Sequence, residues 1–87
     1  MTEYFNSGAI VKAIAGREKN QIFLILKVDK NNAYLVNGKT RQLNCPKKKN
    51  FKHLYLLEKS SNLDMDKLTD GDIIKYLKDY IKSRDCK

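Results

Sequence analysis

The sequence predicts a mainly β fold, a small and partly open five-stranded barrel covered by one C-terminal α-helix. Short apolar runs separated by turn signals fill residues 9–57, a pattern typical of a β meander. Near the C-terminus apolar residues recur at helical spacing, at Ile73, Ile74, Leu77, Tyr80 and Ile81. The chain has 87 residues, 41% of them hydrophobic, which suits a single domain spanning residues 1–87 and leaves no room for a second core.

We expect strands near residues 9–14, 21–28, 33–36, 39–43 and 53–57. Strand 21–28 is apolar on both faces, since Phe23 and Ile25 alternate with a second apolar set, Ile22, Leu24, Leu26 and Val28. One face is expected to fill the barrel and the other to need a cover. We expect these five short strands to close into a barrel, because closure hides the sheet edges that a flat sheet would expose.

Two turns connect the middle strands. The polar segment 29–32 predicts a turn between the second and third strands. Asn37-Gly38 predicts a two-residue type I′ hairpin between strands 33–36 and 39–43, because this turn needs positive φ at both central residues. In that register Val36 faces Lys39 and Tyr34 faces Arg41.

The C-terminal helix, residues 69–84, supplies the cover. Thr69 is a good N-cap with Asp72 three residues on, and Leu68 and Ile73 have the spacing of a hydrophobic staple. Asp70 and Asp72 suit the positive start of a helix. Residues 58–68 are polar and serine-containing, so we expect a connector.

The charge is uneven along the chain. The sequence holds 18 Lys and Arg against 10 Asp and Glu, a net charge of +8. Residues 1–59 carry the whole excess, and residues 60–87 are balanced. Residues 39–52 hold six basic side chains and no acidic one. Such a surplus indicates a polyanionic partner, either nucleic acid or an anionic membrane surface.

Several classes of protein and site are disfavoured. The longest apolar run is five residues, Ile22 to Leu26, so no membrane span is expected, and the first residues lack the pattern of a signal peptide, so we expect a cytoplasmic protein. Cys45, Cys86 and the lone His53 are too few for a four-ligand Cys/His zinc site. The aspartates of residues 64–72 fail the calcium-loop template at Leu68 and Thr69. We find no catalytic motif, and we expect neither an enzyme nor a cofactor.

Two segments carry a family resemblance. Residues 8–20, Gly-Ala-Ile-Val-Lys-Ala-Ile-Ala-Gly-Arg-Glu-Lys-Asn, with the strand after them, resemble the KOW motif of ribosomal proteins and transcription elongation factors. Gly16 matches the glycine of that motif, and Arg17 and Lys19 match its basic loop, whereas Asn20 replaces a second glycine that many members have. Residues 45–54, Cys-Pro-Lys-Lys-Lys-Asn-Phe-Lys-His-Leu, resemble bacterial KOW-domain RNA-binding proteins related to the archaeal and eukaryotic large-subunit ribosomal protein fourteen-e.

The resemblance covers residues 6–57 and implies an SH3-like five-stranded barrel of KOW type. It implies binding to structured RNA, above all ribosomal RNA of the large subunit, with a backbone role for Gly16. The charge pattern and the resemblance together give the expected RNA-binding residues: Arg17, Lys19, Asn20, Lys39, Arg41, Lys47, Lys48, Lys49 and Lys52. We expect the chain to be monomeric off the ribosome and to have no small-molecule substrate.

Alternatives remain for each feature. The lysine run can be a solvated loop, and Tyr34, Phe51 and Tyr55 can either stack on bases or pack in the core. His53 can pack at a strand edge or donate to a phosphate. A protein-interaction module in the transcription or translation machinery is the alternative function. A membrane surface is disfavoured because the predicted helix is balanced in charge.

Overall fold

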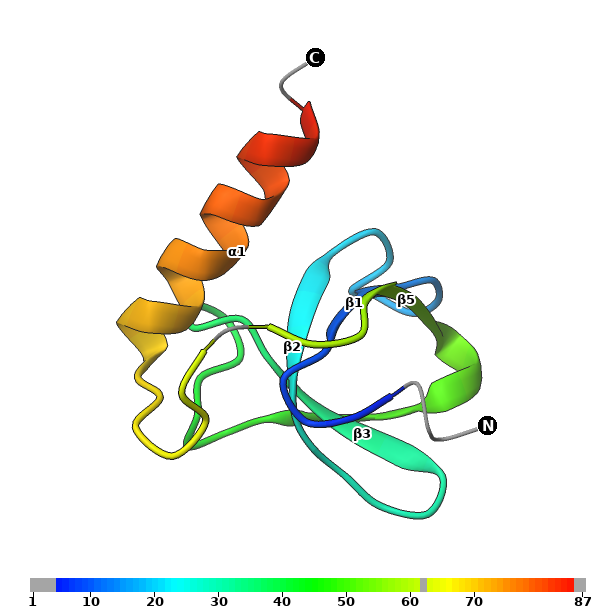
Figure 1. Cartoon of the computed structure of the whole chain (residues 1–87). Helices are drawn as coiled ribbons and strands as arrows, with labels where there is room; N and C mark the ends of the chain where they lie inside the picture. Colours follow the sequence, from blue (N-terminus) through cyan, green and yellow to red (C-terminus); the bar gives the residue numbers. More distant parts are fainter. Residues whose placement is uncertain (1–4, 62, 86–87) are drawn as a thin grey trace.

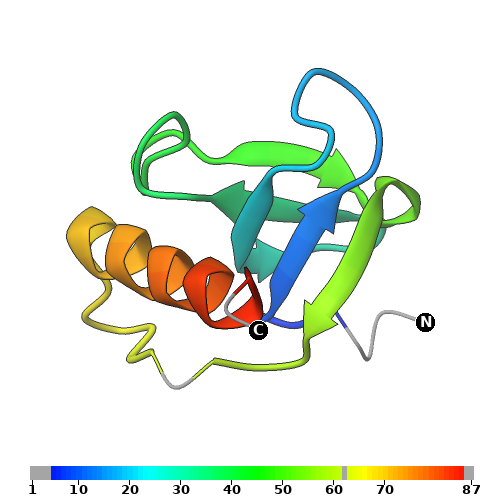
Figure 2. The same ribbon diagram turned by 90° about the horizontal axis from the view of Figure 1, so that it is seen from above.

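A curled antiparallel sheet with a helix on its outer face forms the fold (Figures 1 and 2). The computed structural model describes residues 5–61 and 63–85, and this part contains five strands, one 3-10 helix and one α-helix. In chain order they are β1 (Ile10–Ala13), β2 (Ile22–Val28), β3 (Asn32–Val36), β4 (Lys47–Asn50), the 3-10 helix η2 (Phe51–His53), β5 (Leu54–Glu58) and α1 (Asp70–Asp85). The predicted class, mainly β with one C-terminal helix, is confirmed.

The strands follow the order β4-β3-β2-β1-β5, and every neighbouring pair is antiparallel. Within the described residues no ladder joins β4 to β5, so the sheet is curled without being closed into a barrel. Its strand order is compatible with an SH3-like barrel. Four of the predicted strands, 9–14, 21–28, 33–36 and 53–57, match observed strands to within two residues at each end.

The sheet buries apolar side chains on both faces. The inner face holds Phe23 and Ile25 of β2 in one core cluster with other fully or nearly buried residues, Ala9, Val11, Ala13, Ala33, Leu35 and Leu54. The outer face holds a second cluster, in which the helix residues Ile73 and Leu77 cover Ile10, Leu24 and Val36. The prediction that one face of β2 fills the sheet interior and that the helix covers the other is therefore confirmed.

The start of α1 has the predicted capping box. Thr69 Oγ1 accepts a hydrogen bond from the Asp72 amide at 3.1 Å, and Asp72 Oδ2 accepts one from the Thr69 amide at 3.3 Å. These bonds satisfy amide groups that have no partner within the helix. Leu68 packs against the same outer cluster as Ile73, which agrees with the predicted staple.

The predicted strand 39–43 and its type I′ hairpin are wrong. Gly38 has φ +81°, but among the described residues Asn20 alone is a non-glycine with positive φ, so Asn37 lacks the conformation that the turn requires. Instead, Asn37 Oδ1 accepts hydrogen bonds from the amides of Lys39 at 3.0 Å and Arg41 at 2.9 Å. Because the Asn37 side chain accepts hydrogen bonds from amides that a β-strand would donate to its neighbour, residues 37–46 form a loop.

The fourth strand therefore begins later, at Lys47. Tyr34 lies opposite Lys48 instead of Arg41, and Leu35 lies opposite Lys47. The run of lysines lies between two of the predicted strands, whereas in the structure it forms an edge strand. Lysine is common on sheet edges because its charge opposes pairing with another sheet.

The other connections follow local chemistry. Asp29 Oδ1 accepts hydrogen bonds from the amides of Asn31 and Asn32, which confirms the polar turn between β2 and β3. The segment between β5 and α1 is more than a polar connector, because Leu63, Met65 and Leu68 pack against the outer cluster. The described residues form no helix long and apolar enough to cross a membrane.

Candidate functional site

The loop between β1 and β2 carries the first basic residues of the predicted site. Ala13 and Gln21 close its base, since the Ala13 amide donates to the Gln21 carbonyl at 3.0 Å. Gly16 has φ +83°, in the left-handed region that favours glycine, and its carbonyl accepts from the Lys19 amide at 3.2 Å. Asn20, at φ +76°, adopts the left-handed conformation that asparagine tolerates better than most residues. Arg17 and Lys19 are left exposed on the loop.

Glu18 fastens this loop to β4. Its Oε1 accepts a hydrogen bond from Lys49 Nζ at 3.0 Å, and its Oε2 lies 3.8 Å from Lys47 Nζ. The Lys49 and Glu18 side chains are only 10% and 15% exposed, so this contact is largely shielded from water. The hydrogen bond from Lys49 lowers the pKa of Glu18 below its ordinary value, and the charges of both lysines lower it further.

The register of β4 separates its lysines. Lys47 and Lys49 lie opposite Leu35 and Ala33, which belong to the inner core, and both reach Glu18 on that side. Lys48 lies between them in sequence and is exposed on the other face. The structure thus gives the three lysines two roles: Lys47 and Lys49 hold the loop, while Lys48 carries a solvent-exposed charge.

Lys48 has an aromatic neighbour on the outer face. Tyr34 is its cross-strand partner, and on the other side Lys27 Nζ lies 4.9 Å from the centre of the tyrosine ring. The Tyr34 hydroxyl donates to Asp29 Oδ2 at 3.2 Å, which fixes the ring. A half-buried tyrosine between two lysines offers an aromatic face and cations at the same place.

The loop after β3 carries Lys39 and Arg41, the former exposed and the latter half-buried. It is fixed to the start of the helix, because the Leu43 amide donates to Asp70 Oδ1 at 2.8 Å. Gly38 packs tightly there: a Cβ at this position would lie 2.5 Å from the Asp70 carbonyl oxygen and 2.7 Å from Ile74 Cγ1. Positive φ and close packing both favour glycine at this position.

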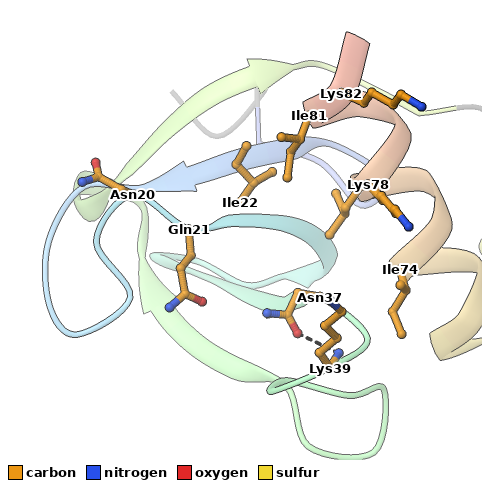
Figure 3. Close-up of a pocket in the computed structure, with 10 residues that line it drawn as sticks. Asn20, Gln21, Ile22, Asn37, Lys39, Ile74, Lys78, Ile81 and Lys82 are labelled. Atoms are coloured by element: carbon orange, nitrogen blue, oxygen red, sulfur yellow. Dashed lines mark hydrogen bonds between the residues drawn. The ribbon is translucent and has the colours of Figure 1, made fainter. Parts of the chain in front are cut away.

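A groove of about 760 Å³ brings parts of the predicted site beside the helix (Figure 3). Asn20 and Gln21 come from the loop before β2, Lys39 comes from the loop after β3, and Lys78 and Lys82 come from α1. Apolar side chains complete the lining: Ile22 comes from β2, and Ile74, Leu77 and Ile81 come from α1 (Figure 3).

The remaining predicted residues lie elsewhere. Lys52 is exposed in η2. Phe51 packs on Phe5, with ring centres 5.2 Å apart, whereas Tyr55 is 59% exposed on β5. His53 is half-buried, and its carbonyl accepts from the Ile14 amide at 2.9 Å.

No metal or redox site emerges from the described residues. Cys45 is an exposed free thiol, and Cys86 lies outside the residues that the structure describes. In residues 5–61 and 63–85 no three His, Cys, Asp or Glu side chains gather as metal ligands would.

The structure thus joins the predicted residues in two groups and adds others. Arg17 and Lys19 share one region with β4, and Asn20 shares the groove with Lys39. Sequence reasoning missed Glu18 as the link, and it missed Lys78 and Lys82 because the C-terminal third is neutral as a whole. Their four-residue spacing, which places both on one helix face, was the available signal.

Comparisons with known proteins add no family assignment. No protein-family model matches the chain, and no curated protein matches its sequence. The KOW resemblance therefore stays a prediction.

Proposed function

We propose that this chain is a non-enzymatic RNA-binding module that docks on structured RNA, with ribosomal RNA as the expected class. One observation carries the proposal: Glu18 holds the loop of Arg17 and Lys19 against the lysine strand β4. Cations that are distant in the sequence thereby lie in one region of the surface. A positively charged region of fixed shape suits the phosphates of a folded RNA.

The contacts proposed here are mainly to phosphate. Arginine offers a planar fork to phosphate oxygens and lysine a mobile point charge, so Arg17, Lys19 and Lys48 are the expected contacts. Lys47 and Lys49 act chiefly by positioning the loop, because Glu18 already offsets part of their charge. Phosphate contacts set position and orientation without reading the base sequence. The proposal assigns no catalytic residue, cofactor or small-molecule substrate, and it places the protein in the cytoplasm, monomeric off the ribosome.

A paired set of variants tests the proposal. Arg17→Ala/Lys19→Ala removes two exposed cations from the region, and Lys67→Ala/Lys75→Ala removes two exposed cations from the neutral C-terminal third. Fluorescence anisotropy with a ribosomal RNA fragment, between about 50 and 200 mM salt, measures affinity and its salt dependence. We expect the first variant to bind at least tenfold more weakly and to make the negative slope of log K against log salt shallower by about 1.4–1.8.

The control variant should keep a slope close to that of the unmodified protein. Equal losses of RNA affinity in the two variants would mean that only the total charge matters. That result would contradict binding at one defined surface region. Unchanged binding by a folded Arg17→Ala/Lys19→Ala variant would contradict the proposal itself.

A protein-interaction module is the second candidate, and one observation favours it. Tyr55 is 59% exposed on β5, the last strand in the sheet order, and an exposed aromatic residue on an edge strand suits a protein partner. Salt separates the two functions, because RNA binding weakens steeply with added salt and an apolar interface does not.

A further inference from the structure

We infer that the groove between α1, the start of β2 and the loop after β3 holds an unpaired nucleotide of the bound RNA. This inference rests on the proposed function and adds a binding subsite to it. The base would lie on the apolar wall, with its phosphates towards the lysines at the edge. The groove volume, about 760 Å³, falls within the range of pockets that hold small organic ligands.

The first argument is apolar surface that the core leaves uncovered. Ile73 and Leu77 point from α1 into the outer cluster and are 0% and 5% exposed. Ile74 and Ile81 lie outside that cluster and line the groove, and Ile81 is 39% exposed. The apolar stripe of the helix is therefore wider than the part of it that the sheet covers. Ile22 of β2 also lines the groove, so apolar side chains from the sheet and from the helix together offer a surface for the face of a flat ring.

The second argument is charge. Lys39, Lys78 and Lys82 line the groove, and its lining within the described residues includes no Asp or Glu. In Figure 3 the side chains of Lys78 and Lys82 extend from the helix away from Gln21 and Asn37, so their ammonium groups lie at the outer edge of the groove, beyond its apolar lining. An apolar floor with cations at the edge is complementary to a ligand with an apolar ring and an anionic tail. A nucleotide has this chemistry.

The third argument is hydrogen-bonding capacity at the sheet end of the groove. The Asn37 amide is engaged within its own loop, since its nitrogen donates to Thr40 Oγ1 at 3.0 Å and its oxygen accepts from two backbone amides. Among the described residues the side chains of Asn20 and Gln21 make no such bonds, and both are exposed. Carboxamides of this kind can pair with the polar edge of a base.

Position favours RNA over an acidic peptide as the occupant. Asn20 belongs to the loop of Arg17 and Lys19, so the groove continues the proposed phosphate-binding surface. Proteins bind single-stranded RNA by combining a cationic groove with contacts to the faces of unstacked bases. An unpaired base next to a helical stem could enter the groove while the stem occupies the loops.

Methyl NMR of the full chain tests the inference with a short single-stranded oligoribonucleotide as the probe. We expect the isoleucine methyl signals of Ile22, Ile74 and Ile81 to shift on titration, while that of Ile25, which is fully buried in the inner core cluster, stays in place. Adenosine monophosphate should shift the same signals at higher concentration, and inorganic phosphate should leave them unchanged.

Two variants give an independent measurement. Ile81→Ala should weaken binding of the oligoribonucleotide about fivefold by removing apolar contact area. Lys78→Ala/Lys82→Ala should weaken it about tenfold and make the negative slope of log K against log salt shallower by about 1.4, the value for two phosphates of a single strand. Lys67→Ala/Lys75→Ala is the matched control for the lost charges, and thermal unfolding confirms that each variant is folded.

The outcomes separate this inference from the proposed function. The groove inference is wrong if the groove methyl signals do not shift and the groove variants bind the oligoribonucleotide like the unmodified protein. The proposed function still stands in that case if Arg17→Ala/Lys19→Ala weakens binding of the ribosomal RNA fragment. If the unmodified protein binds neither the ribosomal RNA fragment nor the oligoribonucleotide, both proposals are wrong. If an acidic peptide shifts the groove methyls and RNA does not, the groove belongs to a protein partner and the inference is again wrong.

Discussion

At the scale of single residues, Glu18 decides how the basic surface is assembled. An acidic residue between Arg17 and Lys19 lowers the local charge in the sequence, yet it draws Lys49 and Lys47 to the loop. The lysines of β4 thereby lie over the inner core with a partner for their charge. Glu18 thus lowers the positive charge of the surface by one unit, and it also fixes the shape of that surface by joining the loop to β4.

The Glu18 pair should stabilise the fold in a pH-dependent way. Because its folded-state pKa lies below the ordinary value, 4.5, the stabilisation is fully present above that pH and is lost as the pH falls through the lowered pKa. Glu18→Gln should therefore lower the melting temperature at pH 7, by about 4–8 °C for a loss of about 1 kcal/mol, and have progressively less effect as the pH falls through the lowered pKa of Glu18.

Circular dichroism melts across this pH range measure the effect. Asp66→Asn is the control, since it removes an exposed carboxylate that pairs with no cation in the described structure. If Glu18→Gln lowers the melting temperature as much in acid as at pH 7, the carboxylate charge is not the cause of the lower stability.

At the scale of elements, the sequence predicted what periodicity and local chemistry determine. The strands of the inner core alternate apolar residues, and the capping box at Thr69 is a local pattern, so both were found. β4 could not be found in this way. Lys47-Lys48-Lys49-Asn50 has no apolar alternation, and it becomes a strand because the exposed edge of β3 pairs with it.

The same limit applies to the candidate site. Arg17, Lys19 and the lysines of β4 could be predicted as basic residues from the sequence. The attachment of their loop to β4 through Glu18, and the placement of Asn20, Lys39 and Lys78 around one groove, depend on contacts between distant segments. The net charge of the C-terminal third was also misleading, because a helix that is neutral as a whole can still place two lysines, Lys78 and Lys82, beside a groove.

The loop after β3 should depend on one contact with the helix. Asp70→Ala removes the acceptor of the Leu43 amide, whereas Asp70→Asn keeps an oxygen that can accept this bond. We expect Asp70→Ala to cost about 1 kcal/mol and to speed hydrogen exchange at the Leu43 amide, with Asp70→Asn closer to the unmodified protein. Equal exchange rates in the two variants would contradict a specific role for the acceptor oxygen.

At the scale of the whole molecule, the helix is part of the core and also one wall of a binding groove. A chain of this length is expected to have a net stability of only about 4–13 kcal/mol, so the few residues that join α1 to the sheet matter greatly. Ile73 is fully buried against Ile10, Leu24 and Val36. Ile81, two turns later on the same helix, is 39% exposed and contributes to the groove instead.

Matched truncations should separate these two functions of the helix. Ile73→Ala should lower the free energy of unfolding by about 2–4 kcal/mol, because it leaves a cavity beneath the helix. Ile81→Ala removes the same atoms from a partly exposed site and should cost less than about 1 kcal/mol. Urea unfolding followed by circular dichroism gives both values. Similar losses of unfolding free energy in the two variants would mean that Ile81 belongs to the core. Packing alone would then explain why this position is apolar, and no ligand would be needed to explain it.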